Sequence, residues 1–171
     1  MQNIFLTPHF TLDEMCKSET AEKHGIVNVP SEEAISNLRR LCEGTLEPLR
    51  EAIGLPIIVT SGFRTKVLND LLAHSSSTSQ HMRGQAADFH VGHTESTDST
   101  ENASHRELLI KAFREILLNP KIGFDQLILY PTFIHVSYVS KEKNRRGILL
   151  ARSNGKLGYG RLTLANALRI E

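Results

Sequence analysis

The segment Ser79-Gln80-His81-Met82-Arg83-Gly84-Gln85-Ala86-Ala87-Asp88 brings an imidazole and a carboxylate together within one short stretch of chain. A second imidazole follows far downstream, in Phe133-Ile134-His135-Val136-Ser137. Two imidazoles and one carboxylate are the ligands of a catalytic zinc ion that keeps its fourth position open for water. The pattern therefore predicts a zinc hydrolase with His81, Asp88 and His135 as metal ligands. On spacing alone, ordinary surface or hydrogen-bonded polar groups remain an alternative.

The chain around these candidate ligands alternates between apolar and polar residues, as in strands with one buried face. Residues 84–91 predict one strand, and residues 125–130 and 133–139 predict a hairpin closed through Pro131-Thr132. Asp88, His90, His135 and Ser137 share the faces opposite the apolar side chains. We therefore expect a sheet with one face in the core and the other carrying the site.

Helical signals flank these strands. The capping boxes at residues 11–14 and 104–107 each predict the start of a helix. Apolar residues at helical spacing predict a long helix from Ser31 to Ile53, kinked or split at Pro48. We further expect a strand at 57–60, a helix at 65–73, and a helix or irregular cover at 162–170. Together these elements predict an α+β class with a largely antiparallel sheet flanked by helices.

Composition limits the domain organisation and the partners. The 171 residues, 40% apolar and 23% charged, suit a single domain spanning 1–171. The polar segment 94–103 is expected to be a mobile surface loop, and Asn154-Gly155 a turn. Cys16 and Cys42 are expected to be reduced packing residues. With 20 basic and 19 acidic side chains and no long apolar run, we expect neither a nucleic-acid nor a membrane partner. We also expect a monomer.

Three blocks of sequence in a fixed order resemble one known family. They are Ser61-Gly62-Phe63-Arg64, then Ser79-x-His81-x-x-Gly84-x-Ala86-x-Asp88, then Ile134-His135-Val136-Ser137. They are similar to the zinc D-alanyl-D-alanine carboxypeptidase (D,D-peptidase) family of cell-wall metallopeptidases, and the likeness extends over about residues 5–140. The resemblance implies the fold shared by these peptidases and the hedgehog signalling domain.

The resemblance also implies roles for residues of the site. It makes His81, Asp88 and His135 the zinc ligands and Arg64 the residue that positions the substrate. A guanidinium fork can hold a carboxylate or a developing oxyanion with two directed hydrogen bonds. Substrates of the family are peptidoglycan stem peptides, whose scissile carbonyl the zinc ion would polarise while its bound water supplies the nucleophile.

One departure from the family pattern concerns the general base. Members usually carry an acidic residue a few positions before the last histidine, whereas residues 130–134 contain none. Asp125 is the nearest upstream carboxylate and is a candidate base. His90 is a second candidate, either as base or as a partner of the ligands. Tyr130 could donate a hydrogen bond to the oxyanion, and Ser137 lacks a base that would make it a nucleophile.

Two functions of different classes follow. One is a peptidase that hydrolyses stem peptides as a D,D-carboxypeptidase or endopeptidase. The other is a zinc-stabilised peptidoglycan-binding module with little or no turnover. The substrate lies outside the cytoplasm, yet the chain shows no signal peptide. We therefore expect a protein made in the cytoplasm that acts on the cell wall, in the periplasm or at the cell surface, after release or export. A phage-type lysin, or a chain whose leader is missing, would explain this.

Overall fold

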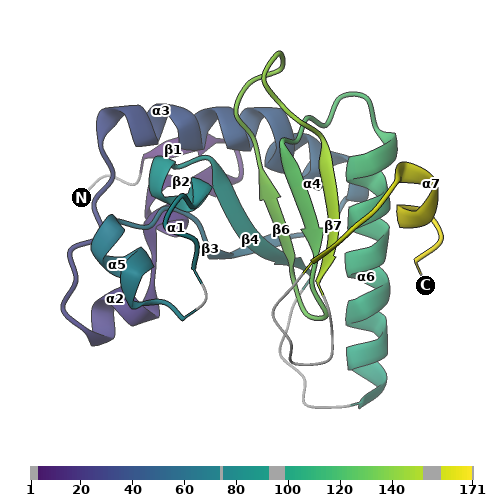
Figure 1. The fold of residues 1–171 in the computed structure, drawn as a ribbon, viewed down its shortest axis with the longest axis horizontal. Helices are drawn as coiled ribbons and strands as arrows, with labels where there is room; N and C mark the ends of the chain where they lie inside the picture. The colour runs from purple at the N-terminus through teal and green to yellow at the C-terminus, as the bar shows by residue number, and fades with distance from the viewer. Residues whose placement is uncertain (1–3, 74, 93–98, 152–158, 171) are drawn as a thin grey trace.

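A six-stranded sheet forms the centre of the computed structural model, which describes residues 4–73, 75–92, 99–151 and 159–170 (Figure 1). The strand order is β3-β4-β6-β5-β7-β8. Neighbouring strands are antiparallel except for β5 and β7, which are parallel. The bounds are β3 Ile57–Ser61, β4 Ala86–Val91, β5 Gln126–Leu129, β6 Ile134–Ser137, β7 Gly147–Ala151 and β8 Tyr159–Arg161.

The predicted α+β class with a largely antiparallel sheet is confirmed. The hairpin of β5 and β6 is also confirmed, with shorter strands than the sequence pattern predicted. Strands β7 and β8 were not predicted. The predicted turn at residues 154–155 lies outside the described residues.

Short elements and helices surround the sheet. A small hairpin, β1 Phe5–Thr7 and β2 Phe10–Thr11, precedes the helices. The helices are α1 Leu12–Cys16, α2 Glu19–Lys23, α3 Glu32–Leu41, α4 Glu47–Ile53, α5 Lys66–Leu71, α6 Ser99–Leu118 and α7 Leu164–Ala167. The predicted cap at Thr11 is confirmed, since its hydroxyl accepts a backbone N–H of the first helical turn, and Ser31 caps α3 in the same way. None of the described helices is long and apolar enough to cross a lipid bilayer.

Helix α6 begins earlier than the capping box at 104–107 predicted. It starts at Ser99, so the expected loop is wrong for residues 99–103, while residues 94–98 lie outside the described residues. The polar composition of this segment pointed to solvent, but Glu101 and Ala103 are residues that also favour helix.

The predicted break at Pro48 takes the form of a widened turn. A π-helical segment, η1 Cys42–Leu46, joins α3 to α4, and Pro48 lies in the first turn of α4. Proline has no N–H to bond the carbonyl four residues earlier, which is that of Gly44. The Gly44 carbonyl instead accepts the backbone N–H of Gly123 at 2.9 Å. A tertiary hydrogen bond thus takes the place of the helical one that Pro48 cannot make.

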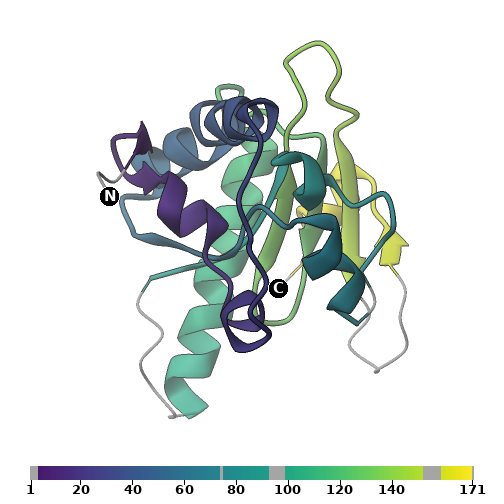
Figure 2. The same ribbon diagram turned by 90° about the vertical axis from the view of Figure 1, so that its left-hand side faces the viewer.

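The core lies between one face of the sheet and the long helices. Helix α6 runs along this side of the sheet (Figures 1 and 2). Alternate residues of the central strands enter one apolar cluster with residues of α3, α4 and α6. From the strands come Ala87, Phe89, Leu127, Leu129, Ile134 and Val136, and from α6 come Leu109, Phe113 and Ile116. Because strand side chains alternate, the residues between them face the opposite side, where the candidate site is found.

Candidate metal centre

The three predicted ligands come together on the sheet face that points away from the core. Asp88 on β4 and His135 on β6 are directly opposite each other in the antiparallel register. His81 belongs to a short 3-10 helix, η2 Gln80–Arg83, which leads into β4 through the left-handed Gly84. The sequence segment that carries both His81 and Asp88 is thus a tight turn followed by a central strand.

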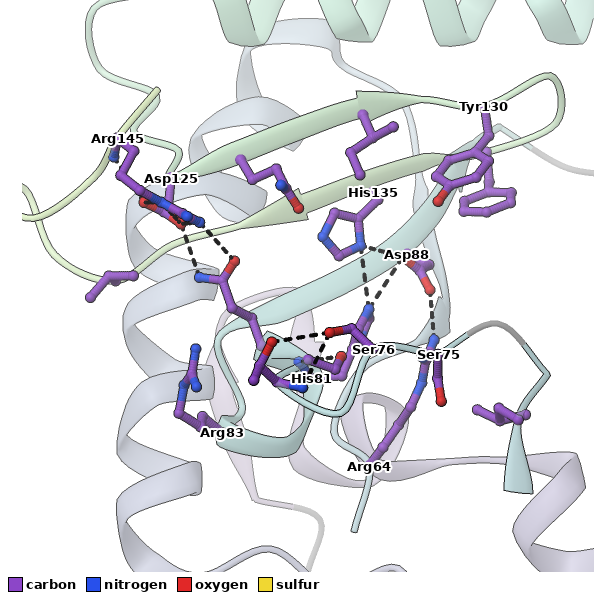
Figure 3. A pocket seen from close by; sticks show the side chains of 18 of the residues that line it. Arg64, Ser75, Ser76, His81, Arg83, Asp88, Asp125, Tyr130, His135 and Arg145 are labelled. Atoms are coloured by element: carbon purple, nitrogen blue, oxygen red, sulfur yellow. Dashed lines mark hydrogen bonds and ion pairs between the residues drawn. The ribbon is translucent and has the colours of Figure 1, made fainter. Parts of the chain in front are cut away.

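The ligand atoms of these side chains have the spacing of a metal site (Figure 3). His81 Nε2 lies 3.3 Å from His135 Nδ1 and 3.4 Å from Asp88 Oδ1, while His135 Nδ1 and Asp88 Oδ1 are 2.7 Å apart. Tetrahedral ligands at about 2.0–2.1 Å from zinc would be roughly 3.3 Å apart. Two of the three separations match this value, and the donor set is one that zinc uses. The residues therefore fit a zinc ion.

The neighbours of His81 fix the orientation of its ring. Its Nδ1 lies 2.7 Å from the carbonyl oxygen of Gly62. A carbonyl only accepts hydrogen bonds, so Nδ1 carries the proton and Nε2 presents a lone pair to the other two ligands. Burial lowers the pKa of His81, which favours this neutral form. A Cβ at position 62 would lie 2.2 Å from the backbone oxygen of Met15, so the close packing of residue 62 against Met15 requires glycine.

Arg64 holds the carboxylate of Asp88. Its Nη2 donates to Asp88 Oδ2 at 2.8 Å, and its Nε donates to Ser61 Oγ at 2.9 Å. The other carboxylate oxygen, Oδ1, is the one that faces the histidines. Burial acts to raise the pKa of Asp88, but its contacts with His81 and His135 outweigh burial and keep the pKa well below its usual range. The predicted contact of Arg64 with substrate stays a prediction. Its Nη1 makes no hydrogen bond to described residues and is the nitrogen that could make this contact.

Asp125, the candidate base, is buried and occupied by other contacts. It is 1% exposed and accepts the backbone N–H and Nε of Arg145 at 2.8 and 2.9 Å. It also accepts Nε2 of Gln80 at 3.0 Å. Burial acts to raise the pKa of Asp125, but these hydrogen bonds lower it below its ordinary value. Since Gln80 precedes His81, the contacts favour a positioning role over that of a base.

His90, the other candidate base, lies on the same face of β4 as Asp88, but it does not line the cavity into which the three candidate ligands face. Its ring meets that of His105 edge-on, with centroids 5.7 Å apart. Its Nδ1 is buried and makes no hydrogen bond to described residues. Burial lowers the pKa of His90. Its predicted role in catalysis stays a prediction that this placement does not support.

A cavity of about 940 Å³ opens directly above the cluster, and His81, Asp88 and His135 line it. Tyr130 and Phe133 also line it, and their rings stack with centroids 4.1 Å apart. Sequence reasoning had not singled out Phe133, Gln80 or Arg145. The adjacency of Gln80 to His81 was a usable signal, whereas nothing in the sequence marked Arg145.

The comparison with known families agrees with this geometry. A family model described as peptidase M15 matches residues 8–117, which include Arg64, His81 and Asp88. The chain belongs to the peptidase M15 family. The predicted D,D-peptidase relationship is confirmed, and the α+β domain is consistent with the hedgehog-like fold of M15 peptidases. Family membership and the His-Asp-His cluster together support a zinc metallopeptidase. His135 lies beyond the matched residues, so its place in the cluster depends on the geometry. No curated protein shows significant similarity to the chain.

Proposed function

We propose that this M15 peptidase binds zinc through His81, Asp88 and His135 and hydrolyses stem peptides of peptidoglycan, as a D,D-carboxypeptidase or an endopeptidase. The observation that carries the proposal is the convergence of three ligand atoms, all within 4.8 Å of one another, beneath a cavity large enough for a peptide. The stem-peptide substrate is inferred from the family relationship.

The residues of the site have different roles. A zinc ion held there would polarise the scissile carbonyl and lower the pKa of the attacking water. The Gly62 carbonyl keeps the proton on Nδ1 of His81, so that Nε2 is free to ligate. Arg64 holds Oδ2 of Asp88, which leaves Oδ1 facing the histidines. Tyr130 lines the cavity, where its phenol can donate a hydrogen bond to a developing oxyanion.

A second candidate function, the zinc-stabilised binding module, is favoured by the ion pairing of the carboxylates in the cavity. Asp88 and Asp125 are the carboxylates that line the cavity among the described residues. Asp88 is paired with Arg64, and Asp125 with Arg145. Neither is free to take a proton from water, so the described part of the chain offers no unpaired acidic base at this site.

Metal content and turnover, measured on the same samples, separate these functions. We expect the purified protein to bind one equivalent of zinc and to convert muropeptides to smaller products seen by mass spectrometry. Free D-alanine would identify a carboxypeptidase, and internal cleavage an endopeptidase. Chelation should abolish hydrolysis and added zinc should restore it.

Two histidine variants control this experiment. His81→Ala should lose both metal and activity, whereas His24→Ala, which alters an exposed histidine outside the cavity, should keep both. Zinc and muropeptide binding without any product would favour the binding module. A wild-type protein that binds no zinc would contradict both candidates.

A further inference from the structure

The cavity contains more positive charge than its own acidic groups neutralise. Four cationic side chains line it: Arg64, Arg83, Lys143 and Arg145. Arg64 is paired with Asp88, and Arg145 with the buried Asp125. Arg83 and Lys143 form no ion pair with any described residue. The chain as a whole has 20 basic and 19 acidic side chains, so this excess is local.

The surplus charge lies at one end of the cavity. In Figure 3, Arg83 and Arg145 lie on one side of His81, and Tyr130 lies on the other. Lys143 belongs to the same connection between β6 and β7 as Arg145 and lines the same cavity. We call Arg83, Lys143 and Arg145 the cationic end. A peptide crossing the metal cluster would therefore meet cations on one side and the stacked rings of Tyr130 and Phe133 on the other.

The two unpaired cations can reach an anion. The Nε of Arg83 donates to Gln85 Oε1 at 3.0 Å, which orients the guanidinium and leaves its terminal nitrogens available. Lys143 is exposed and makes no side-chain hydrogen bond to described residues. A guanidinium fork is suited to a carboxylate, which accepts two parallel hydrogen bonds from it, and the ammonium group of Lys143 adds positive charge to the same cavity.

We infer that the cationic end is a subsite for a free carboxylate on the substrate, carried by a residue on that side of the scissile bond and distinct from the group being cleaved. The protein then prefers peptides with an acidic residue at that position over the same peptides amidated there. This inference rests on the proposed peptidase function.

The test uses pairs of peptides that differ only in one side chain, which is glutamate in one peptide and glutamine in the other. Successive pairs place this residue at each position on either side of the scissile bond. At one position on one side, wild-type kcat/KM should favour the acid by up to roughly tenfold, the size expected for two exposed ion pairs. The double variant Arg83→Gln/Lys143→Gln should bring that ratio close to one. Lys141→Gln removes one positive charge from the connection that carries Lys143, outside the cavity, and should keep the wild-type ratio.

The possible results keep this inference separate from the proposed function. Hydrolysis of both peptides at equal rates at every position would overturn the inference and leave the peptidase function intact. If neither peptide is hydrolysed, the proposed function fails, and calorimetric Kd values for the same peptides decide the inference. Tighter binding of the acid, lost in the double variant and weakened by salt, would support the subsite. Equal Kd values would overturn it.

Discussion

Replacing Asp125 with asparagine would show whether this residue positions the site or takes part in the chemistry. The carboxylate is 1% exposed and joins two segments that are far apart in sequence, through Arg145 after β6 and Gln80 beside His81. In Asp125→Asn the shape is kept, but the negative charge is lost. One oxygen becomes an amide donor that faces other donors.

The expected cost follows from these contacts. Leaving a buried hydrogen-bonding group unsatisfied costs about 1–3 kcal/mol, and more where the group is charged. The side chain of Arg145 is 65% exposed and can turn to water, so we expect about 2 kcal/mol rather than the upper limit. For a chain of this length, that loss corresponds to a fall in Tm of about 4–8 °C.

Urea unfolding at several pH values provides the assay. The folded-state pKa of Asp125 is below its unfolded value, so its stabilisation is present above the unfolded pKa and is lost as pH falls through the folded one. The free-energy difference between wild type and Asp125→Asn should therefore be constant from about pH 5 to 8 and shrink below about pH 4. Asp70→Asn, at an exposed pair with Lys66, is the matched control and should change stability little.

The result that would refute this reasoning is an Asp125→Asn protein as stable as wild type but without hydrolytic activity. That outcome would make Asp125 part of the chemistry, in agreement with its nomination as a candidate base from the sequence. A destabilised protein that keeps bound zinc and much of its activity would support the positioning role.

Two further predictions concern packing near the site and in the core. Gly62→Ala should lower the free energy of unfolding by at least about 2 kcal/mol in urea titration, because its Cβ would lie 2.2 Å from the Met15 oxygen; a change below half that value would show that the contact relaxes. Burial raises the pKa of Cys16 to about 11 and raises that of the fully buried Cys42. Ellman's reagent at pH 8 should therefore label both thiols only after denaturation, and fast labelling of the native protein would contradict this.

Much of the metal cluster could be predicted because its signal is local. Asp88 and His135 alternate with apolar residues in short strands, and the period of two assigns them to the polar face. His81 lies in a turn just before one of these strands, so the short connecting chain limits how far it can lie from Asp88. Their convergence needed only the correct pairing of β4 with β6.

The features that sequence reasoning missed depend on long-range contacts. The π-helical turn before Pro48 is stabilised by the N–H of Gly123, which is distant in sequence. Strand β7 joins the sheet in parallel beside β5, and its pattern gives no sign of that partner. The pairing of Asp125 with Arg145 likewise depends on the connection after β6 folding back over the start of β5. No local periodicity encodes such contacts.

The direct register of Asp88 opposite His135 restricts how this centre can change. A slip of one residue between β4 and β6 would send an imidazole into the apolar interior and bring Val136 or Ile134 to the polar surface. Insertions of a single residue are therefore tolerable in the bend at 131–132 but not inside either strand. Relocating the ligands along the sheet would require steps of two residues, which preserve the side on which each group emerges.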